Sequence, residues 1–61
     1  MQRDLRASNA EREAAVTLLQ VAVGEGRITM AEFEERTQAA YAATTRAELD
    51  VLIADLPRSL W

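Results

Sequence analysis

The sequence predicts a small all-α domain, a helical hairpin followed by a third, short helix. Two observations predict this fold class. Three segments begin with a Ser or Thr followed three residues later by a Glu, which is a signature of helix starts. After each of these starts, apolar residues recur with the spacing of one helix face. Because a chain of 61 residues has room for one domain, we expect the three helices to share a single core.

The three Ser/Thr-to-Glu signatures are capping boxes. In such a box the hydroxyl accepts a hydrogen bond from a backbone N–H of the first helical turn, and the Glu side chain accepts one from the capping residue's own N–H. The pairs are Ser8 with Glu11, Thr29 with Glu32, and Thr45 with Glu48. One match arises readily by chance, but three at the starts of runs rich in Ala, Leu and Glu indicate three helices.

The first two helices have clear predicted bounds. The first runs from about residue 9 to 23 and stops at residues 24–26, where a glycine provides the left-handed conformation that closes a helix. The second follows Thr29 and runs to about residue 43. Only Thr44 and Thr45 then separate it from the third helix, so these two helices must turn sharply against each other.

The third helix is predicted from residue 46 to about Leu56, because Pro57 disfavours helical geometry in the residue before it. The resulting organisation has three parts: an N-terminal arm (1–7), a three-helix domain (8–57) and a C-terminal tail (58–61).

Five apolar residues are expected to form the structural core. Each lies on the apolar stripe of its own helix: Leu19, Phe33, Leu49, Leu52 and Leu56. The three at mid-stripe on separate helices, Leu19, Phe33 and Leu52, are expected to be mutually buried.

A second apolar set is expected to remain uncovered and to form a partner interface. The apolar arc of the first helix exceeds half its circumference, so two neighbouring helices cover only part of it. On the third helix, Val51 points nearly opposite the core stripe. The predicted interface comprises Ala14, Leu18, Val21, Ala47, Val51 and Ala54. Monomers rarely expose a contiguous apolar patch of that kind, which predicts a protein partner or a homo-oligomer.

No residue pattern indicates catalysis, a cofactor or a metal site. The chain contains neither Cys nor His, so its hydroxyl groups have no histidine base. The cluster of Glu32, Glu34 and Glu35 opens a helix, where the macrodipole favours negative charge. Residues 24–27 lack the spacing of a phosphate-binding loop. We expect a protein that is not an enzyme.

Nucleic acid and membrane insertion are not expected either. The net charge is −3, and acidic residues outnumber arginines on the second and third helices, whereas DNA affinity depends on neutralising phosphates. The longest apolar-rich stretch, residues 14–23, falls short of the ~20 residues of a membrane span. No signal peptide is recognised, which predicts a cytoplasmic location, including the cytoplasmic face of a membrane.

Two arginines, Arg12 and Arg36, lie on or beside apolar stripes, which is unusual for a charged residue. One interpretation is an apolar stem packed under a solvated guanidinium. The other is a fixed ion pair with Asp55 or Glu48. The sequence leaves both open.

An ordered set of segments carries a family resemblance: residues 6–13, 24–29, 33–36, 45–49 and 54–57. Together they resemble the SHOCT-like domain of actinobacterial proteins, domain of unknown function 1707. The resemblance implies an oligomerising or adaptor role in a longer protein, often one with membrane segments. This sequence departs from the family pattern at Thr37, where Leu is usual, and at Asn9, where Asp is usual.

The predicted function is therefore a non-catalytic protein interaction module, which oligomerises or docks to a regulatory or membrane partner. The alternative is a transcription-linked regulator, either an anti-sigma-like or a DNA-associated factor.

Overall fold

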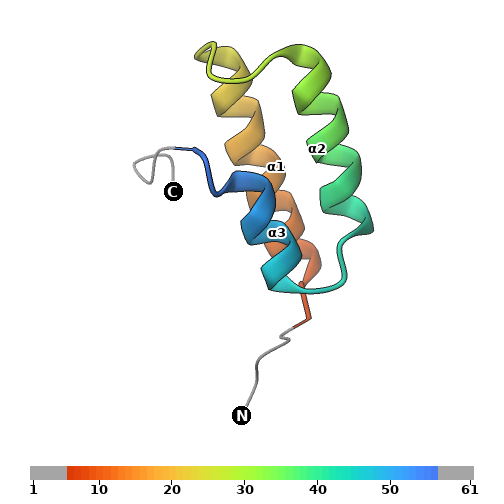
Figure 1. The fold of residues 1–61 in the computed structure, drawn as a ribbon. Helices are drawn as coiled ribbons and strands as arrows, with labels where there is room; N and C mark the ends of the chain where they lie inside the picture. Colours follow the sequence, from red (N-terminus) through yellow and green to blue (C-terminus); the bar gives the residue numbers. More distant parts are fainter. Residues whose placement is uncertain (1–5, 57–61) are drawn as a thin grey trace.

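A computed structural model describes residues 6–56, and these residues form three helices. They are α1 (Asn9–Gly24), α2 (Met30–Ala42) and α3 (Arg46–Ile53). Helices α1 and α2 form an antiparallel hairpin, and the shorter α3 packs against both of them near the N-terminal end of α1 (Figure 1). The predicted all-α fold, a helical hairpin plus a third short helix, is confirmed.

All three predicted capping boxes are present. The Ser8 hydroxyl accepts from the Glu11 N–H at 3.1 Å, and the equivalent bond at Thr29 is 3.0 Å and at Thr45 is 3.3 Å. In each box the Glu side chain also accepts from the backbone N–H of the capping residue. The start of every helix is therefore decided by residues three positions apart.

The end of α1 is a Schellman motif. Gly26 has a φ of 77°, in the left-handed region that glycine adopts at lower free-energy cost than other residues. Its N–H donates to the Val23 carbonyl at 3.1 Å, and the Arg27 N–H donates to the Ala22 carbonyl at 2.9 Å. Ile28, just after this turn, is buried in the core.

Helix α3 ends at Ile53, which corrects the predicted end near Leu56. In a continuing helix the Leu56 N–H would donate to the Leu52 carbonyl, four residues back. That carbonyl instead accepts from Arg36 Nη1 at 3.0 Å, and the Leu56 N–H donates to the Ile53 carbonyl. The chain thus leaves the helical path after Ile53, and the Leu52 carbonyl is satisfied by the arginine of α2 instead of by the next helical turn. Pro57 lies outside the described residues.

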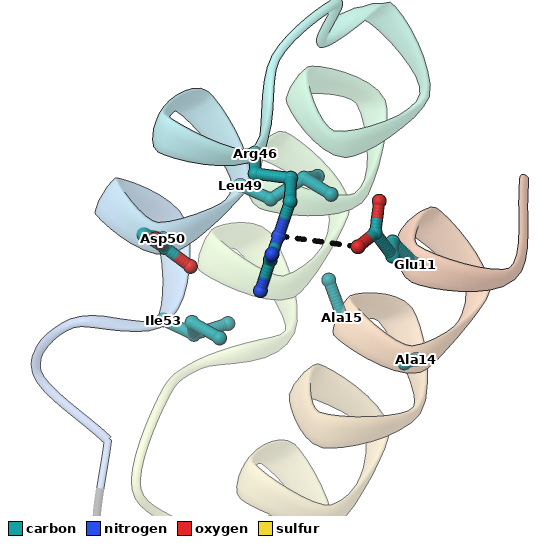
Figure 2. Close-up of a pocket in the computed structure, with 7 residues that line it drawn as sticks. All are labelled: Glu11, Ala14, Ala15, Arg46, Leu49, Asp50 and Ile53. Carbon is teal, nitrogen blue, oxygen red and sulfur yellow. Dashed lines mark ion pairs between the residues drawn. The ribbon is translucent and has the colours of Figure 1, made fainter. Parts of the chain in front are cut away.

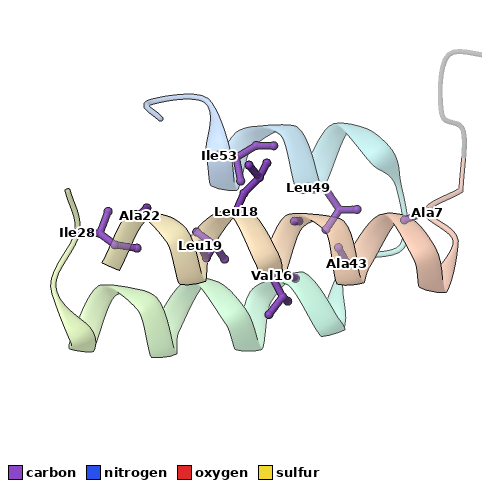
Figure 3. Close-up of a cluster of buried hydrophobic side chains, with 11 residues drawn as sticks. Ala7, Val16, Leu18, Leu19, Ala22, Ile28, Ala43, Leu49 and Ile53 are labelled. Carbon is purple, nitrogen blue, oxygen red and sulfur yellow. The ribbon is translucent and has the colours of Figure 1, made fainter. Parts of the chain in front are cut away.

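The core forms where α1 is enclosed by the other two helices (Figure 3). Leu19 has no exposed surface, and Leu49 is buried. Phe33, Leu52 and Leu56 are only partly buried and pack against the edge of the core. We expected Leu19, Phe33 and Leu52 to be mutually buried; Leu19 is fully buried, whereas Phe33 and Leu52 are only partly buried beside it, which corrects their predicted place at the centre of the core.

The length of α3 explains why Phe33 and Leu52 lie at the edge. Helix α3 has 8 residues and α2 has 13, which corresponds to about 12 Å and about 20 Å of helix. Because α3 follows α2 after a short turn, it runs back along the hairpin but ends before the first turn of α2. Phe33 belongs to that turn, and Leu52 belongs to the last turn of α3.

The two arginines on the apolar stripes, Arg12 and Arg36, donate hydrogen bonds to backbone carbonyls at the ends of neighbouring helices. Arg36 forms an ion pair with Asp55, one of the alternatives that the sequence left open, at 2.8 and 3.0 Å, in addition to its bond to the Leu52 carbonyl. Arg12 binds neither of the predicted acids. Its Nε and Nη2 donate to the Ala43 carbonyl at 3.1 and 2.9 Å, and its Nη1 donates to Asn9 Oδ1. Arg12 thereby joins α1 to the end of α2.

The chain just before α1 also packs on the domain. The Ala7 N–H donates to the Thr44 carbonyl at 3.0 Å, and Arg6 forms an isolated antiparallel bridge with Thr45. Ala7 is buried. The segment between α2 and α3 is therefore held from both sides, by residues 6–7 and by the capping box of Thr45.

Candidate interaction surface

The structure divides the predicted partner interface. Ala47 and Val51 lie on the face of α3 that points away from the core, the C-cap residue Ala54 continues this face in helical geometry, and Val51 is 74% exposed. We call these three residues the outer α3 stripe. Their spacing of four and three residues is that of one helix face.

Leu18 does not belong to an exposed interface, which corrects its predicted role. It is 4% exposed and points toward Ile53 of α3 (Figure 3). Helix α3 lies over the flank of α1 that the sequence suggested would stay uncovered. Ala14, on the same flank, is half-buried, and Val21 is 38% exposed.

A small pocket lies between α1 and α3 (Figure 2). Its volume is about 120 Å³. The lining combines four apolar and three charged side chains: Ala14, Ala15, Leu49, Ile53, Glu11, Arg46 and Asp50. Among the predicted interface residues, only Ala14 lines this pocket.

Charged side chains form the rim of the pocket. The Arg46 side chain crosses the gap between the helices, and its Nε lies 3.1 Å from Glu11 Oε2. Glu11 also accepts the capping-box bond from the Ser8 N–H through Oε1. The Asp50 carboxylate points toward the space that Arg46 crosses (Figure 2). One cation thus stands beside two carboxylates, and the rim is negative by one charge.

The opposite edge of the outer α3 stripe is acidic as well. Glu48 accepts from the backbone N–H groups of Thr44 and Thr45, and these bonds lower the pKa of its carboxyl. The Arg36 guanidinium lowers the pKa of Asp55 through the hydrogen bonds between them. The outer α3 stripe therefore runs between Asp50 on one side and Glu48 and Asp55 on the other.

Sequence reasoning missed the pocket because its two halves are far apart in the chain. Glu11 and Arg46 are 35 positions apart, and Glu11 already had a local explanation as a capping-box residue. No pattern within one helix predicts that Arg46 crosses to α1. The available signal was weaker: Arg46 and Asp50 are four residues apart, which places both on one side of α3.

Within residues 6–56 no group of three or more potential metal ligands comes together. In the same part of the chain, no helix combines the length and apolar character needed to cross a membrane. One buried polar atom in the described part of the chain, the hydroxyl of Thr37 on α2, has no hydrogen-bond partner.

Comparison with known proteins gives a family and no function. The sequence pattern of the DUF1707 SHOCT-like domain matches residues 5–57. Two uncharacterized proteins of Mycobacterium tuberculosis, from two strains, are each 48% identical to this chain over 52 residues. The match covers 85% of this chain but 26% of each relative, so the chain spans about a quarter of their length. No solved structure matches.

Proposed function

This chain belongs to the DUF1707 SHOCT-like domain family, and we propose that it is a non-catalytic protein interaction module. In this role it mediates oligomerisation or docks to a regulatory or membrane partner. A cytoplasmic location, including the cytoplasmic face of a membrane, is part of the same proposal and is supported by the family resemblance.

The observation that carries the proposal is the two-sided apolar character of α3. Its inner face buries Leu49 and Ile53, while its outer face exposes Val51 between Ala47 and Ala54. A helix at the surface of a complete globular unit normally carries polar residues on its outward face. An outward apolar stripe on the shortest helix is typical of an element that packs against a further protein surface.

The charge distribution favours a protein partner over the alternative of a DNA-associated regulator. Arg46 is the one basic residue of α3 and is paired with Glu11, while Glu48 and Asp50 belong to the same helix. On α2, Arg36 is paired with Asp55. Neither helix offers a guanidinium to a phosphate without first breaking an ion pair.

The test compares Val51→Glu with Gln38→Glu. Both changes add one negative charge at an exposed helical position, but Gln38 lies on α2, away from the outer α3 stripe. We expect Val51→Glu to abolish self-association or a specific partner complex, measured by sedimentation velocity of the wild type and of each variant. Circular dichroism verifies that both variants stay helical. Equal behaviour of the two variants in every complex tested would contradict the proposal.

A further inference from the structure

The pocket between α1 and α3 is large enough for one apolar side chain. Its volume of about 120 Å³ is close to that of an engineered cavity of about 150 Å³ that accommodates benzene. Ala14 and Ala15 on one side, with Leu49 and Ile53 on the other, provide apolar walls. An aliphatic side chain of Leu or Met size matches this space. The pocket therefore supplies an anchor point beside the broader contact of the outer α3 stripe.

The charges around the pocket select the partner. Two neighbouring acids already form ion pairs within the domain: Glu11 pairs with Arg46, and Asp55 pairs with Arg36. Asp50 stands at the rim with its carboxylate exposed, and the chain as a whole carries a net charge of −3. A cationic side chain beside the anchor would pair with Asp50, whereas an anionic one would be repelled.

The same charges disfavour a second copy of this chain as the occupant. A symmetric dimer contact places the same surface patch of both copies against itself. Here that arrangement would bring Asp50 of one copy, with its acidic neighbours, onto the acidic surface of the other. A basic segment of a different protein surface encounters no such repulsion.

The shape of the site favours a helix as the binding segment. The pocket is a gap between α1 and α3, and the small side chains Ala14, Ala47 and Ala54 let a helix of the partner approach closely. An amphipathic helix that lays its apolar face into such a groove is a recurrent recognition mode.

We infer that the pocket between α1 and α3 binds one apolar side chain of a basic amphipathic helix of a partner protein, with an Arg or Lys of that helix against Asp50. This inference rests on the proposed function, because it names the partner chemistry of the same surface. Arg46, which is paired with Glu11, must then either keep this pair beside the incoming cation or rotate toward solvent.

The experiment uses a designed peptide of about 15 residues, long enough to form a helix, with Leu on one face and Arg on both flanks. A matched peptide carries Glu in place of every Arg. Each is titrated into the ¹⁵N-labelled chain and followed by amide chemical shifts. We expect the Arg peptide to shift the resonances of Ala14, Asp50 and Ile53, and the Glu peptide to bind at least about tenfold more weakly.

Two variants locate the contact. Asp50→Asn is expected to weaken binding of the Arg peptide about two- to fivefold, the range of an exposed ion pair. Its matched control, Glu34→Gln, also removes one exposed carboxylate but lies on α2 outside the pocket lining, and it is expected to leave the affinity unchanged. Ala14→Leu fills the pocket, so we expect loss of binding with the helical circular dichroism retained.

Several results would overturn the inference. These are equal binding of both peptides, no binding of either, shifts confined to α2, or the same effect of Asp50→Asn and Glu34→Gln. A wild-type dimer that Val51→Glu dissociates would identify a second copy as the occupant, which overturns the inference but leaves the proposed function standing. If Val51→Glu behaves like Gln38→Glu while the Arg peptide binds as expected, the contact through the outer α3 stripe that carries the proposed function is contradicted, and the pocket inference is supported.

Discussion

Helices α1 and α3 are held in the domain by different forces. Helix α1 buries five side chains, including Leu19, which has no exposed surface. Helix α3 buries two, Leu49 and Ile53, and depends more on polar contacts at its ends. These contacts are the capping box at Thr45 and the bond from Arg36 to the Leu52 carbonyl.

This difference indicates a division of roles. Apolar burial resists local opening, whereas exposed polar contacts open at low free energy. Helix α1 is therefore the scaffold of the domain, and α3 is the helix whose local opening requires less free energy. The outer α3 stripe and the pocket both involve α3, so the proposed contact surface lies on the less firmly held helix.

The largest expected effect is a loss of unfolding free energy, which we compare between Leu19→Ala on α1 and Leu52→Ala on α3. Leu19→Ala removes a fully buried side chain and should cost about 2–5 kcal/mol, which is most of what a domain of this size has. Leu52 is partly buried, so its truncation should cost clearly less. Urea unfolding followed by circular dichroism measures both. Equal losses would contradict the division between scaffold and adjustable helix.

The second prediction tests whether a polar contact matters as much as apolar burial. Arg12→Met keeps an apolar stem but removes both bonds to the Ala43 carbonyl, and it should destabilise the domain by about 1.5–3 kcal/mol. The control is Arg27→Met, which breaks an exposed pair with Glu25 and should cost less than about 1 kcal/mol. Thermal unfolding that ranks the two variants the other way would show that the Arg12 contact is dispensable.

The third prediction is a gain of stability on α2. Thr37 carries a buried hydroxyl without a hydrogen-bond partner in the described part of the chain, and such a group is costly. Thr37→Val replaces the hydroxyl with a methyl group of similar size, so we expect a gain of about 1 kcal/mol. Differential scanning calorimetry would detect it as a raised melting temperature. A lowered melting temperature would mean that the hydroxyl is hydrogen-bonded in solution.

The smallest expected effect concerns Asp55 and is confined to α3. Because Arg36 lowers the pKa of Asp55, the stabilisation from this pair is present above about pH 4, the unfolded pKa, and is lost as pH falls through the lower folded value. Asp55 is 62% exposed, so the pair contributes less than about 1 kcal/mol. Asp55→Asn should remove this part of the acid dependence and leave stability at pH 7 slightly reduced.

Hydrogen exchange distinguishes the helices in that experiment. Asp55→Asn should accelerate exchange of α3 amides and leave the amides around Leu19 unchanged, since those open only with the whole domain. Acceleration throughout the chain would show that α3 and α1 open together.

The sequence predicted where each helix begins. Each capping box links residues three positions apart, as in Ser8 and Glu11, and its hydrogen bonds form within one turn. The Gly26 turn is local in the same sense, because its left-handed conformation depends on the residue itself. The Arg36–Asp55 pair was also foreseen, as one of the alternatives for the two arginines.

The sequence did not predict which residues remain exposed at the interface or which lie at the edge of the core. Ala47, Val51 and Ala54 are exposed as the pattern of the third helix indicated, but Leu18 is buried and Phe33 is only partly buried. Which flank of α1 is covered depends on where α3 lies across the hairpin and on how soon it ends. No spacing within a single helix contains that information.

By itself, then, the sequence determined three helix starts and the apolar character of both faces of α3, because hydrogen bonds within one turn and helical periodicity depend only on near neighbours. The tertiary structure alone decided that α3 ends at Ile53, that Leu18 is covered and that Arg46 meets Glu11 above a pocket. These outcomes join residues from 16 to 35 positions apart, and they depend on the packing of one helix against another.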